Sequence, residues 1–341
     1  MTPERQTQGQ PTPALLFDTI NSYQRTAAIK AAIELSLFTA IAQGKTTAAE
    51  IGKSCDASER GTRILCDFLV IMGFLTKQDS HYGLTQDSAV FLDKRSPAYM
   101  GTVIDFTLSP MLTDHFKELT AAVKKGGTAS GEDTVVAPDH PVWVKFARAM
   151  APMMAMPAQL LAPLADAEAN QKLRVLDIAA GHGLYGIAFA KRNPQAEVTA
   201  VDWANVLEVA KENAQAAGVS DRYQTKSGSA FDVDYGTGYD IVLLTNFLHH
   251  FDVPTCETLL RKVHGALKDE GRAVTLEFVP NSDRVSPPQA AAFSMMMLGA
   301  TPGGDAYTFA ELDGMFQNAG FARNELHELP PTIQRVVISH K

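Results

Sequence analysis

The chain has few cysteines and no long apolar segment. Its 341 residues include three cysteines, Cys55, Cys66 and Cys256, which form no C-x-x-C pair and cannot all be joined within one chain. This usage is typical of a reducing compartment, so we expect the cytoplasm. No apolar run approaches the length of a membrane span, and the N-terminus lacks the basic segment and apolar core of a signal peptide, so no membrane partner is expected.

Positive charge is also scarce. Lysine and arginine number 30 against 38 aspartates and glutamates, giving a formal net charge of −8. Such a balance gives no general electrostatic reason to bind nucleic acid or an anionic membrane. The content of 45% hydrophobic and 20% charged residues is that of an ordinary globular protein, and the length is sufficient for two domains.

The first part of the chain alternates helical patterns with short breaks. Residues 1–12 are polar and are expected to form a disordered tail. Residues 13–96 predict amphipathic helices followed by a β-hairpin with polar residues at its tip, FLTKQDSHYGLT, which together make an α-rich winged-helix domain.

A winged helix can bind DNA or serve as a packing module. The helix expected to contact DNA carries only Arg60 and Arg63 against Glu59 and Asp67, too little positive charge for phosphate contacts. The first helices are apolar on much of their surface, and such a surface is normally covered by a partner. We therefore predict a homodimer formed through this domain, with no nucleic-acid partner.

Residues 97–165 predict a mostly helical linker, broken by a glycine-rich loop at residues 124–133. The linker contains FARAMAPMMAMPAQLL, and a second methionine cluster covers residues 295–297. Methionine side chains are flexible and polarizable, so they serve equally in core packing and in pocket lining. Two methionine-rich helices beside a ligand site would suit a flat, apolar substrate.

The stretch from Leu173 to Trp203 opens the domain expected over residues 166–341. It predicts a strand, a tight turn with Gly181 and Gly183, a helix, and a second buried strand that ends on Asp202. Asp177 lies at the end of the first strand. Both acids are therefore expected at the carboxyl ends of neighbouring parallel strands, where open α/β sheets bind their ligands.

This turn also satisfies G-x-G-x-x-G, the weak pattern of a dinucleotide site. Asp177 counts against that interpretation, because its carboxylate would repel a pyrophosphate drawn to the helix N-terminus. The same carboxylate suits a ligand with an ammonium and a sulfonium, such as S-adenosylmethionine. In that case Asp202 accepts hydrogen bonds from the ribose hydroxyls, and Trp203 offers an apolar face to the adenine.

The candidate chemistry follows the fourth strand of this domain. There the chain reads NFLHHFD, which places His249 and His250 at the carboxyl edge of the sheet, and the next strand brings Glu277 to the same edge. A histidine with a carboxylate beside it is a suitable acid–base pair near neutral pH. The last two strands meet at Pro330-Pro331, a turn too tight for a crossover, so they are expected to pair antiparallel.

Over nearly its whole length the chain resembles the small-molecule O-methyltransferases that include plant caffeate and flavonoid enzymes, hydroxyindole O-methyltransferase and bacterial natural-product enzymes. The matching motifs are VLDIAAGHG, VDW, GSAF, FLHHFD, LEFVP and PGGDAYT. The resemblance implies an α/β architecture: a Rossmann-like class I methyltransferase domain with an antiparallel C-terminal hairpin, preceded by the winged-helix dimerisation domain.

The resemblance also implies roles for particular residues. His249 falls on the catalytic base and Glu277 on the acid that orients it. The residues expected at S-adenosylmethionine are Asp177, Gly181, Gly183, Asp202, Trp203, Ser229, Ala230, Phe231 and Thr245. Phe146, Met150 and Met297 fall on positions that line the substrate, and no metal is expected.

The chain departs from the family pattern at several of these positions. Ala179 replaces the usual first glycine of the turn, Ser229 an acid that often contacts adenine, and His250 the acid that commonly follows the base. The second glutamate that orients the base falls on Ala306, with Asp305 one residue away.

Taken together, the sequence predicts S-adenosylmethionine-dependent methyl transfer to a hydroxyl, phenolic in character, of a small aromatic metabolite. Two alternatives stay open. The nearer is a methyltransferase that acts on carbon or nitrogen and works by proximity alone. The more distant is a ligand-sensing winged-helix regulator without enzymatic activity.

Overall fold

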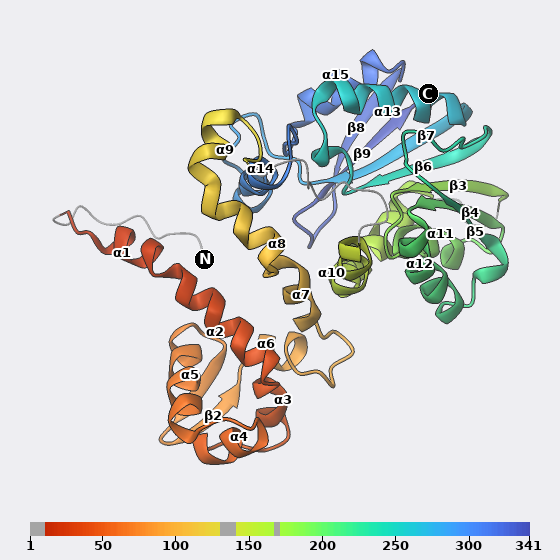
Figure 1. Cartoon of the computed structure of the whole chain (residues 1–341). Coiled ribbons are helices and arrows are strands. Elements are labelled where there is room, and N and C mark those ends of the chain that lie inside the picture. Colours follow the sequence, from red (N-terminus) through yellow and green to blue (C-terminus); the bar gives the residue numbers. More distant parts are fainter. Residues whose placement is uncertain (1–10, 130–140, 167–170) are drawn as a thin grey trace. The chain divides into compact units, whose positions relative to one another are not determined.

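The computed structural model describes residues 11–129, 141–166 and 171–341. The chain divides into two compact units, residues 1–104 and residues 105–341 (Figure 1). Most of the predicted N-terminal tail and residues 130–133 of the glycine-rich loop lie outside the described residues.

The first unit is helical with one small hairpin. Strands β1 (Leu75–Gln78) and β2 (His81–Leu84) pair antiparallel, which confirms the predicted hairpin. A capping box of Thr47 and Glu50 starts one helix, and the Ser58 hydroxyl caps the next by accepting from Gly61 N–H. The helices are α1 (Ala14–Ile20), α2 (Ser22–Glu34), α3 (Leu37–Ala42), α4 (Ala48–Ser54), α5 (Glu59–Ile71) and α6 (Gln86–Phe91).

The core of this unit leaves α1 uncovered. Phe38, Ile51 and Leu69 are fully buried at its centre. In contrast, none of the residues of α1 is buried, and Leu15 and Phe17 are 76% and 57% exposed. A row of large apolar side chains in water is unfavourable by roughly 25 cal/mol per Å² of apolar surface. The structure therefore leaves an apolar helix that requires a covering surface.

The second unit is built on a seven-stranded sheet with the order β5-β4-β3-β6-β7-β9-β8. The first five of these strands pair in parallel, whereas β9 runs antiparallel to both β7 and β8. The predicted α/β class I methyltransferase fold with an antiparallel C-terminal hairpin is thus confirmed. The strands are β3 (Leu173–Ile178), β4 (Ala196–Asp202), β5 (Tyr223–Ser227), β6 (Tyr239–Thr245), β7 (Leu267–Glu277), β8 (Arg323–Glu328) and β9 (Arg335–His340).

The strand order locates the ligand edge. From β3 the chain moves outward through β4 to β5, and then returns to place β6 on the other side of β3. In open α/β sheets ligands bind at such a reversal, outside the carboxyl ends of the strands. The residues that follow β3, β4, β6 and β7 therefore surround the candidate site.

Helices complete the second unit. Those after the strands are α11 (Leu184–Arg192), α12 (Ala204–Ala216), α13 (Val253–Ala266), α14 (Pro288–Ala300) and α15 (Phe309–Asn318). Those before β3 are α7 (Ile104–Thr107), which begins at the unit boundary, α8 (Pro110–Thr113), α9 (Leu119–Lys125) and the long α10 (Pro141–Ala165). The short 3₁₀ helices of this unit are η2 (Asp114–Glu118), η3 (Ser220–Arg222) and η4 (Leu248–His250), whereas η1 (Gly101–Val103) belongs to the first unit. Within the described residues, no helix is both long and apolar enough to cross a membrane.

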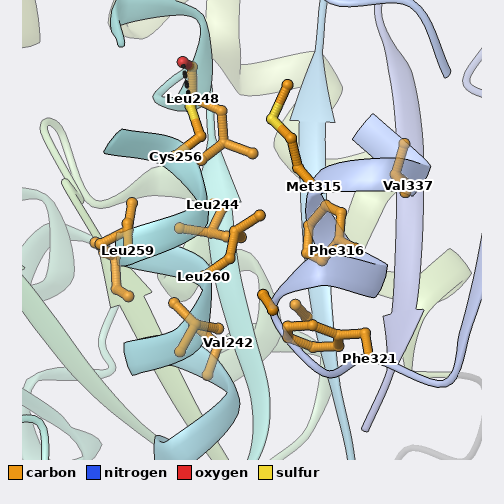
Figure 2. Close-up of a cluster of buried hydrophobic side chains, with 14 of the residues drawn as sticks. Val242, Leu244, Leu248, Cys256, Leu259, Leu260, Met315, Phe316, Phe321 and Val337 are labelled. Carbon is orange, nitrogen blue, oxygen red and sulfur yellow. Dashed lines mark hydrogen bonds between the residues drawn. The ribbon is translucent and has the colours of Figure 1, made fainter. Parts of the chain in front are cut away.

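A buried apolar cluster fixes α13 and α15 against the sheet (Figure 2). Leu244 of β6, Leu260 of α13 and Phe316 of α15 are all fully buried there. Truncation of such a side chain to alanine typically costs 2–5 kcal/mol. The cluster holds the carboxyl end of β6, and hence the residues that follow it, in a fixed place.

Candidate active site

Asp177 is the last residue but one of β3 and is completely buried. Its Oδ2 accepts a hydrogen bond from Gly186 N–H at 3.0 Å, whereas its Oδ1 is buried and has no hydrogen-bond partner among the described residues. Burial raises the pKa of Asp177 to about 7, and the bond from Gly186 opposes this shift. A buried carboxylate oxygen without a donor is costly, so it calls for a ligand that can donate or carry positive charge.

The turn after β3 depends on its glycines. Gly183 has φ +75°, and a Cβ there would lie 2.6 Å from the Tyr223 hydroxyl and 2.9 Å from Ala210 Cβ. Only glycine combines this backbone conformation with so close a neighbour. Ala179 also adopts a left-handed conformation, with φ +55°, so the alanine keeps the shape at a position where glycine is usual in the resembling family.

Asp202 is the last residue of β4 and accepts hydrogen bonds that hold the same turn. Its Oδ2 accepts from Gly181 N–H at 2.8 Å, and its Oδ1 accepts from Trp203 N–H at 2.7 Å. Burial raises the pKa of Asp202 to about 6, against the lowering effect of these two bonds. Each carboxylate oxygen can accept a second hydrogen bond, so Asp202 can still receive two hydroxyls of a sugar.

The residues expected near adenine lie on two neighbouring loops. Trp203 precedes α12 and packs in a cluster with Trp143 of α10 and Val206 of α12. Phe231, in the loop after β5, meets the Phe251 ring edge-on at 5.1 Å between centroids. Ser229 Oγ accepts from Phe231 N–H at 3.1 Å and so shapes the loop. Thr245, the last residue of β6, is buried.

His249 and Glu277 meet at the carboxyl edge of the sheet. His249 Nδ1 lies 2.6 Å from Glu277 Oε2, and both side chains are about 95% buried. The second oxygen of Glu277, Oε1, accepts from the backbone N–H groups of Phe247 and Leu248, each at 2.9 Å, and from that of His249 at 3.4 Å. Glu277 therefore holds both the turn that carries His249 and the imidazole ring itself.

Two further contacts fix this turn. The Cys256 thiol donates to the Leu248 carbonyl at 3.3 Å (Figure 2), and burial raises the pKa of that thiol to about 12, so it stays protonated. Gly304 lies against the same turn: a Cβ there would be 2.1 Å from the His249 carbonyl oxygen. Glycine at this position is required by that close approach.

No second acid reaches His249 from the PGGDAYT motif in the described structure. Ala306 is buried and carries no polar group, and Asp305 pairs with Arg284 at 3.2 Å on an exposed surface. His249 thus has a single carboxylate partner among the described residues. The neighbouring His250 is held neutral, because burial and the adjacent His249 lower its pKa well below the usual range.

Aromatic rings surround the two histidines. Phe293 of α14 meets the His249 ring edge-on at 4.8 Å between centroids and stacks on Phe278 at 4.0 Å. Trp143 of α10 meets His250 at 6.1 Å. Sequence reasoning missed these three aromatic residues, although Phe293 lies one helical turn before Met297 and shares its helix face.

The predicted substrate residues are placed unevenly. Phe146 packs edge-on against Phe106 of α7, with the centroids 4.9 Å apart, and Met150 and Met297 are buried. Met156 and Met295 are about half exposed, at 47% and 48%. The methionines of the two segments therefore do not all line one pocket. A helix directs neighbouring side chains to different faces, which is why clustering in sequence did not mean clustering in space.

A buried polar chain was also not foreseen. Asn246, directly after β6, donates to the Tyr185 hydroxyl at 3.3 Å and accepts from Gln334, and Tyr185 donates to Met154 Sδ at 3.3 Å. Asn246 adopts φ +55°, a conformation that asparagine tolerates. The chain joins α11, α10 and the β8–β9 loop beside the strand that leads to His249.

Two family models match this chain. The model of the O-methyltransferase dimerisation domain matches residues 17–94, and that of the O-methyltransferase domain matches residues 116–322. The chain belongs to the O-methyltransferase family. Its methyl donor is S-adenosylmethionine, as in that family, and the orphaned Asp177 oxygen and the glycine turn fit this cofactor.

Known proteins resemble this O-methyltransferase over almost its full length. A protein from Nostoc punctiforme, provisionally described as an O-methyltransferase, has a crystal structure with 60% sequence identity and a TM-score of 0.93, covering 98% of this chain and 100% of that one. The 3-hydroxy-5-methyl-1-naphthoate 3-O-methyltransferase of Streptomyces sahachiroi is 28% identical, with 90% and 89% of the two chains covered. The L-tyrosine C(3)-methyltransferase of Streptomyces lavendulae is 27% identical, with 90% and 84% covered.

Proposed function

We propose that this O-methyltransferase methylates a phenolic hydroxyl of a small aromatic metabolite, with His249 as the general base. The observation that carries the proposal is the buried contact of 2.6 Å between His249 Nδ1 and Glu277 Oε2. An ionised carboxylate only accepts hydrogen bonds, so Nδ1 carries the proton and Nε2 presents a lone pair. A neutral imidazole in this tautomer can take the proton of an acceptor hydroxyl.

The remaining residues of the site bind and align. S-adenosylmethionine, when bound, supplies a methyl group on a sulfonium, a strong electrophile. Asp177 with Gly181 and Gly183 would hold its methionine part, and Asp202 its ribose. Trp203, Ser229, Ala230 and Phe231 would hold its adenine, with Thr245 beside them. Phe146, Met150 and Met297 would line the acceptor pocket together with Phe293.

An aromatic acceptor is favoured by the rings around His249 and His250. Edge-to-face and stacked rings contribute about 0.5–1.5 kcal/mol beyond their burial, so a planar acceptor gains more than an aliphatic one. The relative from Streptomyces sahachiroi is named for methylation of a hydroxyl on a naphthoate, which agrees with this acceptor class.

Methylation of ring carbon is the second candidate, since the relative from Streptomyces lavendulae is named as a C(3)-methyltransferase of tyrosine. The same base could ionise a phenol and so activate its neighbouring ring carbon. Mass spectrometry of the product with assignment of the methyl position separates the two reactions. Because the chain belongs to an enzyme family, the alternative of a ligand-sensing regulator without enzymatic activity has no support.

The proposal is tested by a screen of phenols with methyl-labelled S-adenosylmethionine, followed by His249→Ala on the best acceptor. Loss of general base catalysis is expected to lower kcat by about 10² to 10⁴-fold, with little change in cofactor affinity. His250→Ala is the matched control and should change kcat much less. If His249→Ala keeps more than about a third of kcat in a reaction limited by chemistry, alignment alone drives transfer.

A further inference from the structure

The loop after β5 carries the residues proposed to hold adenine. Three backbone hydrogen bonds involve its residues 228–233. Gly228 N–H donates to the Asp202 carbonyl at 2.9 Å, and the N–H groups of Asp232 and Val233 donate to the Ser229 carbonyl at 3.0 and 2.9 Å. These bonds bend the loop, but within the part of the chain that the structure describes no backbone N–H donates to the carbonyls of Ala230 and Phe231. An uncompensated carbonyl in a half-buried loop is unfavourable.

One lysine of α13 meets both carbonyls. Lys262 Nζ donates to the Ala230 carbonyl at 3.1 Å and to the Phe231 carbonyl at 2.7 Å. Its ammonium also lies 4.3 Å from the centre of the Tyr235 ring, and the Tyr235 hydroxyl donates to the same Ala230 carbonyl. A cation that bonds two consecutive carbonyls fixes two peptide planes at once, and charged donors form stronger bonds than neutral ones.

The lysine is held in place by its surroundings. It extends from a helix whose inner face packs in the large core cluster, through Leu259, Leu260 and Val263. Partial burial lowers the pKa of Lys262, and the carboxylates of Asp232 and Asp234 oppose that shift. The ammonium form that the two carbonyls require is thus favoured by acids on the loop itself.

The loop in turn contacts the catalytic turn. Phe231 meets Phe251 edge-on at 5.1 Å, and Phe251 meets Phe247 at 5.0 Å. Phe247 N–H is one of the groups bound by Glu277. A shift of the Ala230–Phe231 backbone would therefore disturb both the adenine surface and the packing behind the base.

We propose that Lys262 is a positioning residue for cofactor recognition: it holds the backbone of Ala230 and Phe231 in the conformation that receives the adenine ring. This inference rests on the proposed placement of adenine against these two residues. The inference assigns Lys262 no direct contact with the cofactor. Its effect is expected on affinity for the adenine-bearing ligand, and not on removal of the acceptor proton.

The test measures the dissociation constant of S-adenosylhomocysteine by calorimetry in the full chain. Lys262→Met, which keeps the length of the side chain but removes its donors, is expected to weaken binding about 10-fold. Lys262→Arg should recover at least half of the loss on a logarithmic scale, because a guanidinium also donates to two carbonyls. Arg261→Met is the matched control: Arg261 is exposed on the same helix, pairs only with Glu257 among the described residues, and should leave affinity unchanged.

A second ligand distinguishes positioning from general loss of structure. S-inosylhomocysteine differs from the first ligand only in its purine, so Lys262→Met should weaken its binding less than threefold if the loop recognises adenine. Equal losses for both ligands, no rescue by Lys262→Arg, or an affinity within twofold of wild type for Lys262→Met would each overturn the proposal.

Two further variants keep the result interpretable. If Lys262→Met does not fold, Tyr235→Phe removes the other donor to the Ala230 carbonyl and should weaken S-adenosylhomocysteine selectively, by a smaller factor. Asp202→Ala tests the cofactor site independently of the loop. If Asp202→Ala weakens binding and Lys262→Met leaves it unchanged, the cofactor site is supported and only the role of Lys262 is contradicted.

Discussion

Replacement of Glu277 by glutamine should change the tautomer of His249, the proposed base, while keeping the shape of the site. Glu277 Oε1 accepts from three backbone N–H groups, those of Phe247, Leu248 and His249, and Oε2 meets His249 Nδ1 at 2.6 Å. The amide oxygen of glutamine can keep the three backbone bonds. Its NH₂ group must then face His249 Nδ1, so Nδ1 has to become an acceptor and the imidazole proton moves to Nε2.

That tautomer cannot accept the proton of the acceptor hydroxyl. Glu277 contacts Nδ1, so the proposal assigns Nε2 to the substrate, and in Glu277→Gln that nitrogen would carry a hydrogen. The variant should therefore lose most of the contribution of general base catalysis, about 10² to 10⁴-fold in kcat. At 1.36 kcal/mol for each factor of ten, this corresponds to about 2.7–5.4 kcal/mol of transition-state stabilisation. Cofactor affinity and thermal stability should change little, because the backbone bonds persist.

The assay is single-turnover methyl transfer from labelled S-adenosylmethionine, so that product release does not mask the chemical step. Glu208→Gln is the control, because Glu208 on α12 is 64% exposed and pairs with Lys211 at 2.8 Å. Thermal unfolding of both variants shows whether the fold is retained. A folded Glu277→Gln enzyme with more than about a third of the wild-type single-turnover rate would refute the tautomer mechanism.

Three other outcomes are expected. Asp202→Ala should weaken S-adenosylmethionine binding by roughly 1.5–3 kcal/mol, the range for a buried charge-assisted hydrogen bond, and NAD should not bind; calorimetry with unchanged affinity, or with comparable NAD affinity, contradicts the assignment. The pKa of Asp177 is about 7 in the folded chain and about 3.9 in the unfolded chain. Without ligand, its contribution to the free energy of unfolding is therefore full below pH 4 and is lost as the pH rises to 7. The affinity for the cationic cofactor should rise as the pH approaches and passes 7, because the carboxyl group ionises there. Calorimetry at pH 5.5 and 7.5 should show tighter binding at the higher pH, with proton release, and the reverse order speaks against Asp177 as the ammonium partner. The chain should sediment as a homodimer formed through residues 13–96, and Leu16→Glu with Ile20→Glu on exposed α1 should yield monomers. A wild-type monomer at micromolar concentration would contradict this prediction.

The fold could be predicted because its signals are local. Strands β3 and β4 appear as short apolar runs, and the glycine turn between β3 and α11 has a composition that few other structures need. The C-terminal hairpin was predictable from the shortness of its connection, which forbids a parallel crossover. Asp177 and Asp202 could be placed at one edge because parallel strands end together, and their register indeed sets Asp177 opposite Ala200 and Ile178 opposite Val201.

Side-chain direction on helices could not be read in the same way. Met295 and Met297 are two residues apart, yet one is 48% exposed and the other 4%. The sequence marks both as apolar, and only the packing of α14 against its neighbours selects which one is covered. Phe293 escaped notice for the same reason, since nothing in its local sequence indicates that its ring meets His249.

The sequence by itself determined the architecture, the cofactor class and the two strand ends that bring His249 and Glu277 to one edge. Only the tertiary structure decided which hydrogen-bond and ion-pair partners these groups have. It placed both oxygens of Glu277 among four donors, left one oxygen of Asp177 without a partner among the described residues, and turned Asp305 toward Arg284. The physical reason is the distance along the chain over which each interaction acts. Strand and turn preferences act over a few residues, whereas these directional hydrogen bonds join groups that are 21, 28 and 88 positions apart. Their partners are therefore decided only when the sheet and helices have packed.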